Sequence, residues 1–441
     1  MWRTRNPMNG ESTGRTDRTR WPTMVVLIVV AGVVAGVIGG LTAEANRLIE
    51  TLAFGFDFTK SPNGPAGAPW WRRLLVALLG GVACGLIWMR IRPRPGGNLV
   101  GVKGASTDPT GTKRLPPLAT VLDAFAQMLI VGTGISQGRE PAPRQYAAVA
   151  AQALARRFRV DVATRGLLIA ATAGAGLASV YNVPLAGALY ALEEVVRPNL
   201  RTRRGWWQVA VAVIISALST AVSWLFNHRA RTYVMPQVRV DVHAYAWAAL
   251  IAVVALVVGF AFQRALAWIK AHEPDTRRLW WTVPIGAVAV AAIGLWNPQI
   301  PGNGQVLVQT VLTGGLLPGA LLIACVAKFG ATLLSFGAGS NGGVLTPSLA
   351  VGASLTMALM GWCHVDAAVG VTVAVVGAAC VLTLTQRSPM FSAMFALELT
   401  GSGLFTSSAV AWGVGLTWAL YLLLPRLARR LRRRGPGPTG A

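Results

Sequence analysis

The hydrophobic and polar positions of this 441-residue chain form long apolar runs separated by short polar stretches rich in Pro, Gly, Thr and Arg. Several runs exceed the roughly 20 residues that cross a bilayer as a helix. The runs at 279–327 and 329–363 are too long for one span, so each folds back or contains more than one helix. The long runs without Asp, Glu, Lys, Arg or His include 22–43, 74–89, 166–192, 205–227, 279–327, 329–363, 367–386 and 399–425. This pattern predicts an all-α polytopic membrane protein.

Composition supports the same class, because 54% of the residues are hydrophobic and 13% are charged. Soluble domains carry about 25% charged residues, which excludes an ordinary soluble enzyme. The net charge is +24, from 40 Lys and Arg against 16 Asp and Glu. In a soluble protein this excess would indicate nucleic acid binding.

The basic residues instead flank the apolar runs, with clusters at 3–20, 197–204 and 426–434. Positive flanks stay in the cytoplasm and attract anionic lipid. We therefore expect a multi-pass protein of the cell membrane with both termini cytoplasmic, in contact with the lipid bilayer and without a nucleic acid partner.

The chain divides into a basic cytoplasmic segment at 1–21, a transmembrane part at 22–425 and a basic cytoplasmic tail at 426–441. The first apolar run begins too late and is too long for a signal peptide, so we expect it to remain as the first helix. The four Cys and four His residues are scattered in or near apolar runs without metal-ligand spacing. No metal site is expected.

An internal repeat relates two parts of the membrane region at an offset of 205 residues. The segment 182–193 matches 387–398, with a Pro and a Glu at equivalent positions. At the same offset, 138–141 falls on 343–346. Two separate matches at one offset indicate a duplicated chain.

The duplication predicts a first half at about 22–228 and a second half at about 242–425. Gly allows a break in the backbone, and Pro fits the first turn of a helix. We therefore expect helices to start inside the membrane at 138–143, at 342–347, and at the two repeated prolines. Duplicated broken helices indicate a substrate site at the membrane midplane. Because helix N-termini carry free N–H groups, the expected substrate is an anion.

Acidic residues in this apolar background are functional candidates, because a carboxylate inside the membrane is costly. Glu140 lies at a predicted helix start, where its carboxylate can take the place of an anion and leave when it is protonated. That behaviour describes a gate linked to protons, and the alternative is a Glu that caps its own helix. Glu193 and Glu194 precede a basic cluster. Either one of them passes protons to the cytosol, or both form an interfacial pair facing arginines.

The motifs resemble those of the CLC family of chloride channels and proton-coupled anion antiporters. Residues 138–140 (GRE) resemble the family's G-[RK]-E-G-P, and 342–347 (GGVLTP) resemble G-G-[IV]-F-A-P. The segment 182–194 resembles N-x-P-L-A-G…E-E, and 389–400 resembles the later P-L-T…L-E-x-T element. These matches occur in family order.

The resemblance implies two inverted halves with broken and re-entrant helices, and a homodimer with one anion pathway per subunit. It implies that Glu140 is the external gating glutamate and that Glu194 is the internal proton-transfer glutamate. It implies no enzymatic chemistry and no cofactor, with small inorganic anions and protons as the transported ions. The backbone amides that would line the anion sites belong to Gly138, Arg139, Glu140, Val344 and Leu345.

Three positions depart from the family pattern. Where the family has an anion-binding Ser in G-S-G-I-P, this chain has Asn98, whose amide is another donor; the Gly-Asn-Leu string resembles the fluoride-transporting branch. Pro141 replaces a Gly after the glutamate and lacks an N–H. The family has a tyrosine that caps its central anion site. When the last helices are matched, this chain has Leu423 at that position, and Tyr421, two residues earlier, is the candidate for the same role.

We therefore predict proton-coupled antiport of chloride or a related anion. A passive chloride channel and a fluoride/proton antiporter are the alternatives within the family. Acidic residues at both Glu140 and Glu194 favour coupling, because channels of the family commonly lack the internal acid. The alternative from another class is a non-transporting membrane scaffold, which the altered anion-site motifs would suit.

Overall fold

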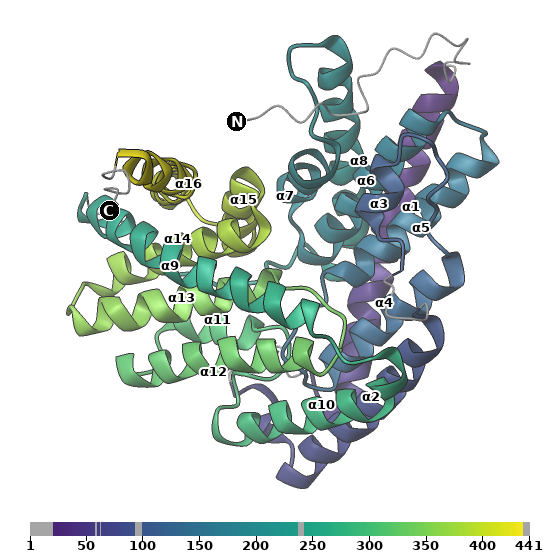
Figure 1. Cartoon of the computed structure of the whole chain (residues 1–441). Helices are drawn as coiled ribbons and strands as arrows, with labels where there is room; N and C mark the ends of the chain where they lie inside the picture. The colour runs from purple at the N-terminus through teal and green to yellow at the C-terminus, as the bar shows by residue number, and fades with distance from the viewer. Residues whose placement is uncertain (1–20, 58–59, 62, 93–98, 237–241, 435–441) are drawn as a thin grey trace, which may run out of the picture.

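The computed structural model of the chain describes residues 21–57, 60–61, 63–92, 99–236 and 242–434 (Figure 1). Helices make up its regular elements. The first half contains α1 (Trp21–Phe54), α2 (Trp70–Ile91), α3 (Val102–Thr107), α4 (Pro117–Gly132), α5 (Pro141–Arg157), α6 (Val162–Tyr181), α7 (Pro184–Leu189) and α8 (Arg203–Asn227). The second half contains α9 (His243–Ala271), α10 (Leu279–Trp296), α11 (Gln305–Thr313), α12 (Pro318–Gly337), α13 (Leu345–Trp362), α14 (Ala367–Gln386), α15 (Pro389–Thr400) and α16 (Leu404–Arg434). Short helical segments are η3 (Gly64–Gly67), η4 (Tyr190–Val196) and η5 (Thr276–Arg278).

The element order of α1 to α8 is repeated by α9 to α16. In the first half α1 packs against α6 and α8, and in the second half α9 packs against α14 and α16. In the same way α5 packs on α6, and α13 packs on α14. The first half, purple to teal, lies beside the green to yellow second half in Figure 1, and α2 packs against α10 between them. The prediction of an all-α fold with two repeated halves is confirmed.

In the described part of the chain, ten helices are long and apolar enough to cross a membrane. The apolar run 279–327 contains α10, α11 and the beginning of α12, and the run 329–363 contains the rest of α12 and α13. Both runs therefore hold more than one helix, as predicted. The most buried candidate spans are α6 and α14, with 83% and 89% of their apolar windows buried. Each half is thus organised around one central helix.

The helix breaks follow the repeat. The helices α5, α7 and α15 begin at Pro141, Pro184 and Pro389. The central helices α6 and α14 end at left-handed residues, Asn182 (φ 57°) and Arg387 (φ 58°), which are equivalent in the repeat. A left-handed residue turns the chain away from the helical path, and a Pro two residues later starts the next helix. The two central helices therefore lead into their broken continuations by the same local device.

Two carboxylates at equivalent positions hold the starts of α7 and α15. Glu193 accepts hydrogen bonds from two N–H groups at the start of α15, at 3.3 and 2.7 Å. Glu398 accepts two from the start of α7, at 3.0 and 2.7 Å. The donors are Met390 and Phe391 for Glu193, and Leu185 and Ala186 for Glu398. Each carboxylate satisfies N–H groups that have no partner within their own helix and lies at the positive end of its dipole.

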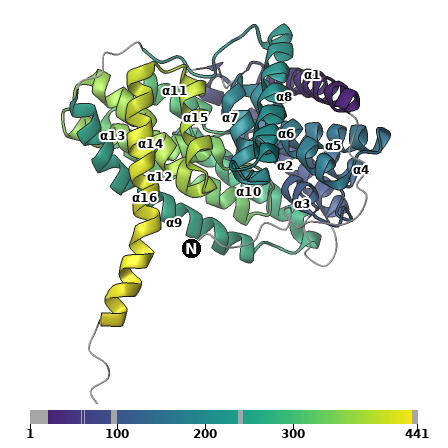
Figure 2. The same cartoon turned by 90° about the horizontal axis from the view of Figure 1, so that it is seen from above.

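The last helix passes the boundary that the sequence predicts for the membrane part. The predicted boundary at 425 falls inside α16, which continues as one helix to Arg434. Figure 2 shows this helix extending beyond the other helices. Residues 1–20 of the predicted N-terminal segment and residues 435–441 of the predicted tail lie outside the described residues.

Glu398→Ala should lower the stability of the protein, because it leaves two N–H groups at the start of α7 without acceptors. The expected loss is about 1 to 3 kcal/mol in the free energy of unfolding, the range for lost caps and unpaired buried donors. Thermal unfolding in detergent measures it. Glu44→Ala is the control, because Glu44 forms a partly exposed pair with Arg47. Equal melting temperatures for the two variants would contradict the capping role of Glu398.

Candidate functional site

The two Gly-containing segments of the repeat meet in the protein interior. The N–H of Gly138 donates to the carbonyl oxygen of Gly343, and the N–H of Gly343 donates to the carbonyl oxygen of Gly138, both at 2.7 Å. This antiparallel bridge joins positions that are equivalent in the repeat. A symmetric pair of this kind places a local two-fold axis between the residues, so the two halves are inverted relative to each other here.

Glu140 lies immediately before α5, and its side chain crosses to the other half. The carboxylate is buried, and Oε1 accepts hydrogen bonds from the N–H (3.0 Å) and from the hydroxyl of Thr346. Because Thr346 is in the first turn of α13, the carboxylate occupies the start of that helix. The other oxygen, Oε2, has no hydrogen-bond partner.

Two glycines make room for this carboxylate. A Cβ atom added to Gly138 or to Gly343 would overlap Oε2 of Glu140. The glycines of the two motifs therefore do more than break the backbone. They let a side chain from one half lie against the backbone of both halves.

The amides at this site differ from those that the sequence predicts. The N–H of Gly138 is taken by the bridge to Gly343, so it does not face an anion site, and this part of the prediction is wrong. In the described residues, the N–H groups of Val344 and Leu345 have no hydrogen-bond acceptor. The residue that sequence reasoning missed is Thr346. Its signal was its place before a Pro at the start of the second motif.

The alternative role of Glu140 as a cap of its own helix is not what the structure shows. Glu140 is the residue before α5, and its side chain makes no capping hydrogen bond to that helix. Pro141 further reduces the need for a cap, because it has no N–H to satisfy. The carboxylate instead accepts hydrogen bonds from Thr346 in the first turn of α13.

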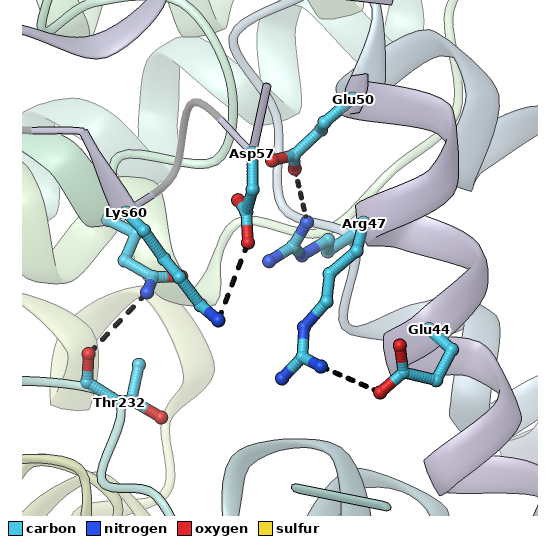
Figure 3. Close-up of polar contacts among 8 residues, drawn as sticks. Glu44, Arg47, Glu50, Asp57, Lys60 and Thr232 are labelled. Carbon is cyan, nitrogen blue, oxygen red and sulfur yellow. Dashed lines mark hydrogen bonds and ion pairs between the residues drawn. The ribbon is translucent and has the colours of Figure 1, made fainter. Parts of the chain in front are cut away.

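The Arg139 side chain pairs with Glu50 of α1, with 2.7 Å between Nη1 and Oε1. Figure 3 shows Glu50 near other charged side chains that lie at the end of α1 and beyond it, beside Thr232. These neighbours are Glu44, Arg47, Asp57 and Lys60. The Arg139 side chain thus anchors the motif to α1, so only its backbone remains for the predicted anion site.

A second arginine lies near both candidate glutamates. Arg144 in α5 donates from Nε to the carbonyl oxygen of Glu140 at 3.0 Å. Its guanidinium lies over the ring of Tyr190, 4.7 Å from the centroid. It also interacts electrostatically with Glu194 and Glu140. Glu194 itself is in η4 and has a buried Oε1 without a hydrogen-bond partner, whereas Glu193 is used as the cap of α15.

Asn98 and Tyr421 are the remaining predicted anion-binding residues. Asn98 lies outside the described residues. Tyr421 is in α16, and its ring stacks on Trp418 with 5.3 Å between centroids. No described hydrogen bond or ring contact joins Tyr421 to Glu140 or to the start of α13. Leu423, which the alignment places at the family's tyrosine, is 55% exposed.

The family model for voltage-gated chloride channels matches residues 80–417. The voltage-gated ClC-type chloride channel ClcB of Salmonella typhimurium strain LT2 is 30% identical over 369 residues, which cover 81% of this chain and 86% of that protein. The chain belongs to the CLC family. It is therefore a multi-pass membrane protein of an anion-transport family.

Solved CLC structures share its fold. A slow cyanobacterial Cl⁻/H⁺ antiporter superposes with a TM-score of 0.77 and 19% identity, over 94% of this chain and 99% of that one. A CLC-type fluoride/proton antiporter superposes with a TM-score of 0.70 and 19% identity, over 90% and 95% of the two chains. At this identity the likeness shows the CLC fold alone.

Gly343→Ala should displace the Glu140 carboxylate from Thr346, because the added methyl group would overlap Oε2. Density for the Glu140 side chain, in a crystal or cryo-EM structure of the variant, checks this expectation. Gly330→Ala is the matched control, since a Cβ added to Gly330 meets no atom within 4 Å. If Glu140 stayed hydrogen-bonded to Thr346 in the Gly343→Ala protein, the packing argument would be wrong.

Proposed function

We propose that this CLC protein exchanges chloride, or a related small anion, for protons across the cell membrane. The observation that carries the proposal is the position of the Glu140 carboxylate on the N–H of Thr346 at the start of α13. Helix starts with free N–H groups bind anions, so a transported anion competes with this carboxylate for the same place. Protonation neutralises the carboxylate and removes the competitor, which links anion passage to protons.

Glu194 is the proposed group that exchanges protons with the cytosol. Two features support this role: Oε1 of Glu194 is buried without a partner, and the Arg144 charge interacts with both Glu194 and Glu140. A passive channel needs a gate but no second proton-binding group, so the presence of both glutamates favours exchange. A non-transporting scaffold would have no use for a carboxylate held on a helix start by one residue.

Chloride is the preferred anion because the ClcB relative is named a chloride channel. One of the solved neighbours is titled a Cl⁻/H⁺ antiporter and another a fluoride/proton antiporter, so fluoride is retained as the second candidate. We further propose a homodimer with one pathway per subunit and with both termini in the cytosol, on the basis of the family and the basic flanks. The proposal assigns no enzymatic step and requires no cofactor.

In liposomes, the purified protein should move protons against their gradient when a chloride gradient is imposed. Glu194→Gln should abolish the proton movement and keep the chloride flux, because a neutral amide cannot carry the proton and leaves the anion path intact. External pH and chloride efflux are recorded together. Chloride flux without proton movement in the parent protein would support the channel alternative, and no flux at all would support the scaffold.

Glu140→Gln should remove the pH dependence of chloride flux and abolish proton coupling, because the side chain no longer titrates. The hydrogen bonds from Thr346 to the amide oxygen can persist, so the variant is expected to fold. Chloride flux measured at about pH 4.5, close to the reference pKa of a free carboxylic acid, and at about pH 7.5 tests the effect. A pH response equal to that of the parent would exclude Glu140 as the gate.

A further inference from the structure

The helix α4 carries a buried carboxylate, Asp123, whose hydrogen bonds among the described residues do not involve Glu140 or Thr346. Asp123 is 3% exposed and is the only charged residue of α4. A buried carboxylate in a membrane protein is costly unless its oxygens are hydrogen-bonded. The groups that offset this cost therefore indicate what the carboxylate does.

Four side chains donate hydrogen bonds to Asp123. Oδ1 accepts from Nε1 of Trp88 at 2.8 Å and from Nδ2 of Asn341 at 3.0 Å. Oδ2 accepts from Nε2 of Gln127 and of Gln145, both at 2.8 Å, and from Nδ2 of Asn341 at 3.0 Å. Gln127 also donates to Oε1 of Gln145 at 3.1 Å, which leaves Nε2 of Gln145 facing Asp123. The carboxylate is thus surrounded by N–H donors, which suits its ionised form.

Two of the four donors come from the segments that hold Glu140 and Thr346. Gln145 is in α5, five residues after Glu140, and Asn341 lies five residues before Thr346. Glu140 and Thr346 are the hydrogen-bonded pair at the start of α13. Through one carboxylate, Asp123 therefore joins the beginning of α5 to the segment that leads into α13.

This joint is separate from the backbone bridge between Gly138 and Gly343, which connects the same two segments. Gln137 adds a longer contact, at 3.5 Å, to the carbonyl oxygen of Ser340. Two segments that are held at one bridge can rotate about it, whereas a further attachment away from the bridge restricts that rotation. The hydrogen bonds to Asp123 provide such an attachment.

A cavity of about 250 Å³ borders Asp123, Gln145 and Asn341. Side chains that face a cavity have fewer atoms packed against them, so packing alone fixes their positions less well. The hydrogen bonds to the carboxylate therefore carry more of the positioning here. Arg92, which also lines the cavity, interacts electrostatically with Asp123 and so reduces the cost of its buried charge.

We propose that Asp123 is a positioning residue for the exchange: it holds α5 and the start of α13 in the arrangement in which the Glu140 carboxylate reaches Thr346. The inference rests on the proposed anion–proton exchange and adds to it a residue that acts through Gln145 and Asn341. Without this attachment the start of α13 moves relative to Glu140. An anion then enters without waiting for Glu140 to be protonated, so proton coupling falls while chloride flux persists.

Asp123→Leu replaces the carboxylate with an apolar group and removes both acceptors. In liposomes, the number of protons moved per chloride should fall by up to about tenfold, because a hydrogen bond to a charged group is worth about tenfold in an equilibrium. This ratio does not depend on how much of the protein is folded. A purely structural role of Asp123 would lower the flux and leave the ratio unchanged, and that result would overturn the proposal.

Two milder variants keep the test decisive if Asp123→Leu does not fold. Asn341→Ala and Gln145→Met each detach one segment and leave Asp123 its other donors, so each should lower the proton-to-chloride ratio. Trp88→Phe is the matched control, because it also removes one donor to Asp123, but Trp88 is in α2 and belongs to neither segment. Its ratio should equal that of the parent. An equal fall in all three variants, or no fall in the first two, would contradict the positioning role.

The position of Glu140 is a second readout that does not require coupled transport. In a crystal or cryo-EM structure of the Asn341→Ala protein, the Glu140 carboxylate should leave the N–H of Thr346, whereas Trp88→Phe should keep this contact. The exchange and the inference can therefore fail separately. Chloride flux without protons in the parent, together with a displaced Glu140 in Asn341→Ala, refutes the exchange and supports the positioning role. A coupled parent, together with an unmoved Glu140 in that variant, does the reverse.

Discussion

Helices that begin inside the membrane leave N–H groups that need an acceptor away from water, and the architecture of this protein depends on how those groups are satisfied. An unpaired buried N–H costs about 1 to 3 kcal/mol. Three helix starts receive a carboxylate from another element: α15 from Glu193, α7 from Glu398 and α13 from Glu140. Each of these bonds ties a broken helix to a distant part of the chain. The contacts that make the breaks tolerable therefore also hold the two halves together.

The three carboxylates differ in how many of their oxygens accept hydrogen bonds. Glu193 and Glu398 each accept two backbone N–H groups, with one at each carboxylate oxygen. Glu140 uses one oxygen for Thr346, and its other oxygen lies against two glycines without a donor. Moving Glu140 thus breaks bonds to a single residue, whereas moving either of the others leaves two N–H groups unpaired. The pseudo-symmetric pair suits a permanent structural role, and Glu140 suits a removable one.

Sequence reasoning reached the fold class and the helix starts because both are local: apolar runs mark spans, and Gly and Pro mark breaks. The offset of 205 residues also brought Glu193 and Glu398 into register. It did not reveal that Glu193 caps α15 in the second half and that Glu398 caps α7 in the first half, since these contacts depend on packing between the halves. For the same reason, the place of Thr346 before a Pro did not reveal its contact with Glu140, because the two residues meet only after segments far apart in the chain fold together. The predicted amide of Gly138 failed because its partner, Gly343, is its own symmetry equivalent.

A buried cation explains why an ionised Glu140, the proposed gate, is compatible with this interior. A lone carboxylate away from water is strongly unfavourable, and fixed cations nearby reduce that cost. Arg144 donates to the backbone carbonyl oxygen of Glu140 and lies over the ring of Tyr190, so these contacts do not depend on the Glu140 side chain at the start of α13. Its positive charge, which interacts with Glu140, therefore stays in the interior when that side chain leaves. An incoming anion restores the balance that the carboxylate provided, so the arrangement favours exchange of one negative group for another over an empty site.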